Sequence, residues 1–181
     1  MSGVLNLYAF VSNDPIRRAD ILGLLEAKFG PQKISDGAVE TTVSKTVFEQ
    51  NISFECKKCA GFLGFFQTFD LRFKLEITIE TILEPATSPE WSSSQPFYDQ
   101  AVNTVWNNSS DYNARRAAIL AHEGLHIGDL EVYFNQAKEK LLKAEGAYNS
   151  KAECVAAGNK LPPELNKIFK DTGTASQNNR D

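Results

Sequence analysis

The strongest constraint on the fold is a period-two alternation of side chains between Leu71 and Ile82. One set of positions is apolar, Leu71, Phe73, Leu75, Ile77 and Ile79, and the other is polar, Arg72, Lys74, Glu76, Thr78 and Glu80. Because successive side chains of a β-strand point to opposite faces, this segment is expected to form a strand with one face on the core and one in water. A sheet with one solvated face is typical of antiparallel arrangements.

Two other segments of the first half also indicate strands. Residues 48–55 alternate in the same way, with Phe48, Ile52 and Phe54 on one side. Residues 4–11 are largely apolar and end in a turn-like Ser-Asn-Asp sequence. Both patterns predict extended structure.

The remaining patterns are helical, apart from a loop rich in proline and serine at 84–96. The pair Asp14-Pro15 is a typical helix start, so a first helix is predicted over 15–29, where Gly30-Pro31 would end it. Apolar residues at helical spacing predict further helices over 97–106, 112–125, 132–142, 150–157 and 163–169. Residues 172–181 offer almost nothing to bury and are expected to be disordered.

These elements predict an α+β fold, in which an antiparallel sheet from the N-terminal half packs on a helical C-terminal half. A chain of 181 residues fits one domain, which we expect over 1–171, followed by a tail at 172–181. Charge excludes one class of partner: 19 basic and 23 acidic side chains give a net charge of −4, so no whole-domain basic footprint for nucleic acid is present. Oligomeric state is left open.

Localisation is left open as well. No apolar run approaches the about 18–20 residues that a membrane span needs. The start of the chain lacks the basic and apolar regions of a secretory signal. We therefore expect either a cytoplasmic protein or one whose export signal has been removed.

The chemistry of the chain is concentrated in His122-Glu123-Gly124-Leu125-His126, where its only two histidines lie four residues apart. On a helix, residues at this spacing share a face, so both imidazoles can reach one Zn²⁺ at about 2.0–2.1 Å. Glu123 is rotated by about 100° from His122, so it flanks the metal and can act as general base toward water that the metal acidifies. The pattern therefore predicts a zinc site with His122 and His126 as ligands and Glu123 as the catalytic residue.

This H-E-x-x-H stretch resembles the active-site helix of the zincin metallopeptidases. More loosely, the second half resembles small, largely uncharacterised bacterial zinc proteases, in which an alternating strand leads through a Pro/Trp loop to a helix of the form matched here by Ala121–Glu131. The resemblance implies a zinc-dependent peptidase acting on a peptide or protein substrate, with an edge strand that pairs with an extended peptide. Two alternatives stay open: a zinc-binding interaction module without turnover, and a zinc amidase acting on cell-wall peptides.

A catalytic zinc also needs a third protein ligand. Glu131 is the first choice: if Gly128 ends the helix, Glu131 follows it by three residues, which resembles the step from glycine to third ligand in metzincins. In a continuous helix Glu131 would point away. Glu145 or Glu153 could then serve from a later helix, and Asp129 is expected to hydrogen-bond to His126 instead of binding the metal.

The three cysteines are not expected to form a second metal site. Cys56-Lys57-Lys58-Cys59 looks like half a zinc ribbon, but the chain has no second C-x-x-C to complete it. In an oxidising compartment, one of Cys56 or Cys59 is expected to form a disulfide with Cys154 and so tie the sheet to the helical half.

Overall fold

The computed structural model describes residues 25–39, 43–60, 67–92 and 99–180. Its contacts divide the chain into two compact units. Unit 1 consists of Met1–Ala27, Ile52–Leu75 and Ala137–Pro163. Unit 2 consists of Lys28–Asn51, Glu76–Gln136 and Glu164–Asp181, so the long strands and helices each contribute to both units.

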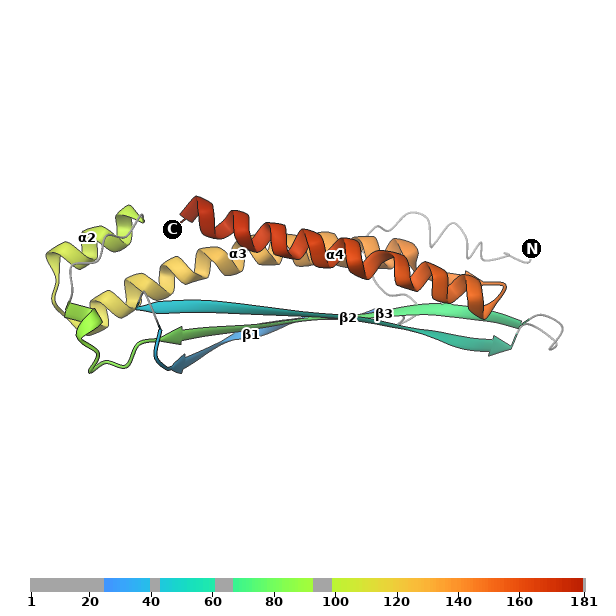
Figure 1. Ribbon diagram of the computed structural model, residues 1–181, viewed down its shortest axis with the longest axis horizontal. Coiled ribbons are helices and arrows are strands. Elements are labelled where there is room, and N and C mark those ends of the chain that lie inside the picture. Colours follow the sequence, from blue (N-terminus) through green and yellow to red (C-terminus); the bar gives the residue numbers. More distant parts are fainter. Residues whose placement is uncertain (1–24, 40–42, 61–66, 93–98, 181) are drawn as a thin grey trace, which may run out of the picture. The chain divides into compact units, whose positions relative to one another are not determined.

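The sheet has four strands: β1 (Glu26–Asp36), β2 (Ser44–Ala60), β3 (Gln67–Leu83) and β4 (Gly146–Tyr148). The order of the long strands is β1-β3-β2, and β4 pairs antiparallel with β3, with Phe69 opposite Tyr148. The expectation of an antiparallel sheet is wrong, because the sheet is mixed. The reason lies in the order: β1 neighbours β3 instead of β2, and Figure 1 shows the arrows of β1 and β3 pointing the same way and that of β2 the opposite way.

The alternation in the sequence is confirmed in β3. Its apolar set is buried, with Leu71, Leu75 and Ile77 fully inaccessible to solvent, while Lys74 and Glu80 are exposed. The predicted strand at 48–55 is likewise confirmed as part of β2.

The helix predicted over 15–29 is wrong at its described end, since residues 26–29 belong to β1. Gly30 and Pro31 lie inside this strand and do not end a helix. Among the described strands β1 lies at the edge of the sheet, where the missing N–H of Pro31 can be tolerated. Gly30 lies against β3, because a Cβ built on it would be 3.0 Å from the carbonyl oxygen of Ile77. Residues 1–24, with the predicted strand at 4–11, lie outside the described part.

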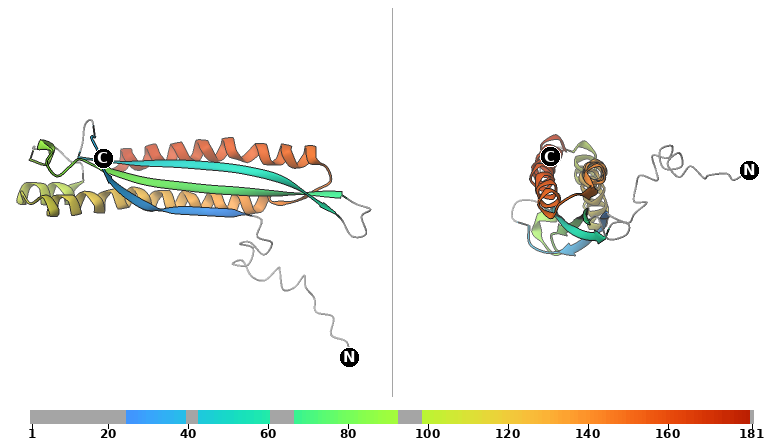
Figure 2. Two further views of the ribbon diagram at one scale, coloured as in Figure 1. Left: turned by 90° about the horizontal axis from the view of Figure 1, so that it is seen from below. Right: turned by 90° about the vertical axis from the view of Figure 1, so that its right-hand side faces the viewer.

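The helical half has fewer and longer helices than the sequence predicted. After a 3₁₀ turn (η2, Pro89–Ser92) come α2 (Gln100–Asn108), α3 (Tyr112–Ala144) and α4 (Lys151–Arg180). The helices expected over 112–125 and 132–142 are one helix that continues through Gly128. The two short helices and the tail expected after residue 150 are also one helix. Within each unit, stretches of α3 and α4 cover one face of the sheet (Figure 2).

The expectation of a disordered tail is wrong for residues 172–176, which belong to α4 and include a buried side chain. Ser176 is buried at 8% exposure and hydrogen-bonds to two side chains of α3, so this polar stretch has partners that its composition does not reveal. None of the helices in the described ranges combines the length and apolarity needed to cross a bilayer.

In unit 2 an aromatic cluster joins η2, α2 and the start of α3. Trp91 stacks on Trp106 with ring centroids 5.8 Å apart and meets Tyr112 edge-on at 4.8 Å. Arg115 lies 4.5 Å above the Trp106 ring and donates to the carbonyl oxygens of Ser109, Trp91 and Trp106. A charge buried at 9% exposure is stable here because carbonyl oxygens accept its N–H groups.

In unit 1 a disulfide between Cys56 and Cys154 joins β2 to α4. This confirms one of the two pairings left open by the sequence. Gly158, one turn after Cys154, permits close packing, because a Cβ built on it would lie 2.3 Å from the Phe54 ring. Phe54 in turn packs on Phe73 of β3.

Candidate metal centre

The two histidines lie one turn apart on α3, in unit 2, and face each other. Their Nε2 atoms are 3.2 Å apart, and their ring planes are nearly perpendicular, at 84°. The His122 side chain is 10% exposed and His126 is 6% exposed, so both rings are largely shielded from solvent. The expectation that the i, i+4 spacing puts both imidazoles on one helical face is confirmed.

Asp99, which immediately precedes α2, contacts His122 at Nδ1, the ring nitrogen that does not face His126. The His122 Nδ1 lies 2.8 Å from Asp99 Oδ2. The other carboxylate oxygen, Oδ1, caps α2 by accepting the N–H groups of Ala101 at 2.7 Å and Val102 at 3.2 Å. The hydrogen bond from His122 holds the pKa of Asp99 below its usual value, the two backbone N–H groups add to this, and burial opposes it.

His126 is held by a two-step chain of hydrogen bonds. Its Nδ1 lies 2.9 Å from the hydroxyl oxygen of Ser176 on α4, and that hydroxyl donates to Asp129 Oδ2 at 2.7 Å. Asp129 thus reaches His126 through Ser176, whereas the sequence suggested a direct bond. Both histidines are therefore linked to a carboxylate, one directly and one through a hydroxyl.

These partners determine the hydrogen-bonding role of each Nδ1 atom. An ionised carboxylate only accepts hydrogen bonds, so His122 must donate its Nδ1–H to Asp99. The single hydroxyl proton of Ser176 goes to Asp129, so its oxygen must accept the Nδ1–H of His126. With both Nδ1 atoms donating to these partners, the Nε2 atoms are the ring atoms that would bind a metal ion, and they face each other within hydrogen-bond distance.

The distance between the two Nε2 atoms is compatible with two ligands of one metal ion. In tetrahedral Zn²⁺ coordination with Zn–N bonds of about 2.0–2.1 Å, two ligand nitrogens are about 3.3–3.4 Å apart. The observed Nε2–Nε2 distance of 3.2 Å is close to this value. Metal-binding histidines also characteristically donate their second N–H to a carboxylate or another acceptor, as both rings do here. These two residues therefore fit two of the ligand positions of a zinc ion, and a third protein ligand is still required.

Glu123 lies beside the histidines on α3 and is 6% exposed. Its Oε1 accepts a hydrogen bond from Ser44 Oγ, at the start of β2, at 2.6 Å. A carboxylate has about four acceptor positions, so this bond orients the group without using up its capacity to accept a proton.

The structure does not bring Glu131 to the histidines. Because α3 continues through Gly128, nine residues separate Glu131 from His122, which corresponds to about 180° around the helix. Glu131 is accordingly exposed. In the described part of the chain, no third His, Cys, Asp or Glu completes a metal-binding group.

The other proposed third ligands have different neighbours. Glu145 and Glu153 belong to unit 1, where Glu145 Oε1 accepts the backbone N–H of Phe73 at 3.0 Å and Glu153 is exposed. The C-x-x-C pair is not a metal site either, because Cys56 forms the disulfide. Cys59 donates to Asp70 at 2.9 Å, and this hydrogen bond raises the pKa of the Cys59 thiol.

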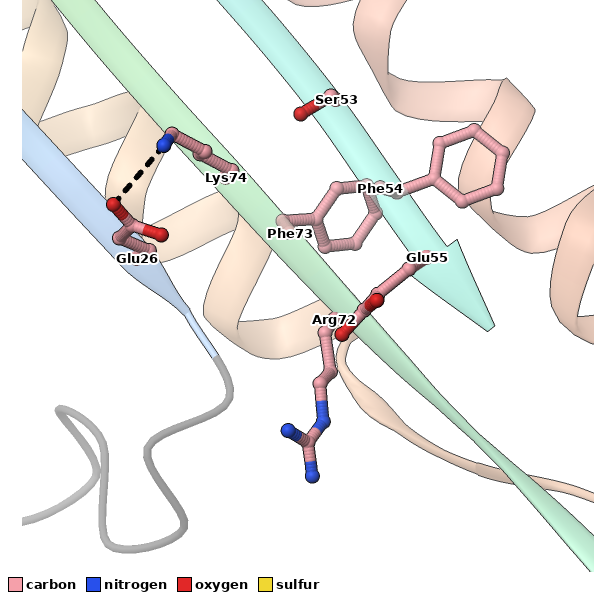
Figure 3. Close-up of a pocket in the computed structure, with 7 residues that line it drawn as sticks. All are labelled: Glu26, Ser53, Phe54, Glu55, Arg72, Phe73 and Lys74. Carbon is pink, nitrogen blue, oxygen red and sulfur yellow. Dashed lines mark ion pairs between the residues drawn. The ribbon is translucent and has the colours of Figure 1, made fainter. Parts of the chain in front are cut away.

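A cavity of about 370 Å³ lies in unit 1, over β2 and β3 (Figure 3). Lys74 on its wall pairs with Glu26 at 3.1 Å, and the guanidinium of Arg72 extends away from the two phenylalanine rings. The residues that line it are Glu26, Ser53, Phe54, Glu55, Arg72, Phe73 and Lys74. None of them belongs to the histidine site.

Sequence reasoning missed Asp99, Ser176 and Ser44 as parts of the site. Asp99 could have been recognised as a helix cap, since Asp is a favoured N-cap residue, but not as a partner of a histidine 23 positions later. Ser176 lies 50 positions from His126, in the segment expected to be disordered.

Comparison with known proteins gives no family for this chain: no family model, no curated protein and no solved structure matches it. The resemblance to zincins therefore rests on the residues of the H-E-x-x-H stretch.

Proposed function

We propose that this protein is a zinc-dependent hydrolase that cleaves peptide bonds. One observation carries the proposal: two imidazole Nε2 atoms lie 3.2 Å apart, with both Nδ1 atoms engaged by partners that require them to donate. Next to them on α3 lies a buried carboxylate, Glu123. Hydrolytic zinc sites use imidazole ligands and a neighbouring acid of this kind, together with a third protein ligand that the described residues do not supply.

In this proposal His122 and His126 hold the zinc ion, with Asp99 and Ser176 orienting their rings. When bound, zinc supplies Lewis acidity, which polarises a carbonyl group and makes water a better nucleophile near neutral pH. Glu123 accepts the proton of the attacking water and then delivers it to the leaving amine. Ser44 holds the Glu123 carboxylate in one orientation through the 2.6 Å hydrogen bond.

The sheet supports an extended peptide as substrate. In the order β1-β3-β2, β2 stands at one end, so one of its edges has no partner strand in the described chain. Edge strands bind extended peptides by adding them as a further strand. Ser44, whose hydroxyl contacts Glu123, begins this strand, which places the proposed base next to a strand of this kind.

The disulfide supports an oxidising compartment as the place where the protein acts. Bonds such as Cys56–Cys154 persist in secreted or periplasmic proteins and are rare where thiols are kept reduced. We therefore favour the alternative in which the mature chain functions after export.

A second function, zinc binding without turnover, is favoured by the burial of the site. His126 and Glu123 are both only 6% exposed, so a substrate carbonyl would need an opening that this conformation does not provide. In this second function α3 would serve as a metal-stabilised scaffold for recognition of a partner.

The variant Glu123→Gln separates the two functions. Glutamine has nearly the same shape and still accepts the bond from Ser44, but it cannot take up a proton, so we expect zinc to be retained and hydrolysis to fall by about 10²–10⁴-fold. Zinc content and cleavage of unfolded casein would be measured, with Glu131→Gln on the exposed side of α3 as the matched control. Equal activity in Glu123→Gln and the control would exclude the base role. A zinc-loaded wild type without hydrolysis would favour the second function.

A further inference from the structure

Two elements outside the H-E-x-x-H helix supply hydrogen-bond partners to the Nδ1 atoms of its histidines. Asp99 comes from the N-terminus of α2, and Ser176 comes from the last turns of α4. We infer that Asp99 and Ser176 are positioning residues that hold both imidazoles in the Nδ1–H tautomer and so set the affinity of the site for a divalent cation. The link to the cation rests on the proposed function, but the tautomers do not.

Asp99 connects the metal site to the folding of α2. One of its oxygens caps the helix through two backbone N–H groups, and the other accepts from His122. Because both oxygens are engaged, the carboxylate is held in place and can present Oδ2 to the ring in one orientation. A shift of α2 would therefore change the hydrogen bond between Asp99 and His122.

Ser176 connects the site to the end of α4 in the same way. The hydroxyl is buried at 8% exposure, and its proton is committed to Asp129, so the oxygen can only accept from His126. Removing the hydroxyl would leave the Nδ1 of His126 without this partner and would allow the proton to move to Nε2. A ring protonated at Nε2 cannot bind a metal through that atom.

The variant Asp99→Asn tests the first connection with little risk to folding. Asparagine is as good an N-cap as aspartate, so α2 should persist. Its side-chain amide can either accept from a protonated Nδ1 or donate to an unprotonated one, so it no longer selects a tautomer. The matched control is Asp111→Asn, at the start of α3, where the carboxylate accepts the N–H of Asn113.

The variants Ser176→Ala and Ser176→Thr test the second connection. Alanine removes the hydroxyl, whereas threonine keeps it and should restore the chain of hydrogen bonds. Thr174→Ala, an exposed hydroxyl on the same helix, is the control.

Two measurements on the disulfide-bonded protein test whether Asp99 and Ser176 set the tautomers of the histidines and the affinity for Zn²⁺. The first is ¹⁵N NMR of the ring nitrogens in metal-free protein, where the only two histidines of the chain give every signal. We expect Nδ1–H for both rings in the wild type, the controls and Ser176→Thr, and a mixture of tautomers at His122 in Asp99→Asn and at His126 in Ser176→Ala. The second is Zn²⁺ affinity by competition with a chromophoric chelator, where Asp99→Asn and Ser176→Ala should each bind about 10–100-fold more weakly.

The outcomes separate this inference from the proposed function. Unchanged tautomers in both variants would overturn the inference, and so would zinc affinities equal to those of the controls. A wild type that has both rings in the Nδ1–H form but binds no zinc would support the positioning role and refute the proposed function. If Ser176→Ala fails to fold, the comparison of Asp99→Asn with Asp111→Asn still decides.

Discussion

Removal of the Cys56–Cys154 bridge is predicted to cost much of the stability of the protein. The bridge closes a loop with a sequence separation of 98 residues. In the chain-entropy treatment, closing a loop of this length removes unfolded-state freedom worth about 4.7 kcal/mol at 25 °C, and measured losses are about 2–5 kcal/mol. We therefore expect the double variant Cys56→Ala, Cys154→Ala to lose about 2–5 kcal/mol in the free energy of unfolding. Alanine is chosen because Cys154 is fully buried and a serine hydroxyl there would add a cost of its own.

The assay is urea unfolding followed by circular dichroism. With a denaturant slope of about 2–3 kcal/mol/M, the midpoint should fall by about 1–2 M. Cys59→Ala, which leaves the bridge intact, is the matched control and should unfold near the wild-type midpoint. A loss below about 1 kcal/mol in the double variant would show that the loop-closure reasoning does not apply to this chain.

Two other predictions test local features. Gly128→Ala should raise the free energy of unfolding by about 0.5–1 kcal/mol, because Gly128 lies inside α3 and a Cβ built on it meets nothing within 4 Å. A loss of stability in urea unfolding would indicate that the helix ends at this glycine, as a Glu131 ligand requires. Burial raises the pKa of Tyr133 to about 12, so its contribution to stability is complete below about pH 10 and is lost as the pH rises through 12. The free energy of unfolding of the wild type, relative to that of Tyr133→Phe, should therefore fall by up to about 3 kcal/mol over this pH range. Unfolding would be measured at several pH values, and a difference that does not change with pH would contradict the raised pKa.

The sequence was most informative where one element alone decides the structure. The alternation in β3 needs only the geometry of a strand, and the shared face of His122 and His126 needs only that of a helix. The choice of Cys56 over Cys59 as the disulfide partner could also be predicted from strand geometry. Cys56 lies on the same side of β2 as Ile52 and Phe54, whereas Cys59 lies on the opposite side.

The failures came where tertiary contacts decide. Gly30 and Pro31 would end a helix in isolation, but on an edge strand neither is excluded. The polar residues 172–176 become part of a long helix because Ser176 is buried against His126 and Asp129. The partners of the histidines come from α2 and α4, at separations that no local pattern can connect.

The central claim is that His122 and His126 together hold one zinc ion through their Nε2 atoms. The most direct test is zinc content after equilibrium dialysis against buffered Zn²⁺, measured by elemental analysis for the wild type and for the double variant His122→Ala, His126→Ala. We predict about one zinc per chain in the wild type and none in the double variant, with folding checked by circular dichroism. A wild type without bound zinc, or a folded double variant that retains it, would contradict the claim.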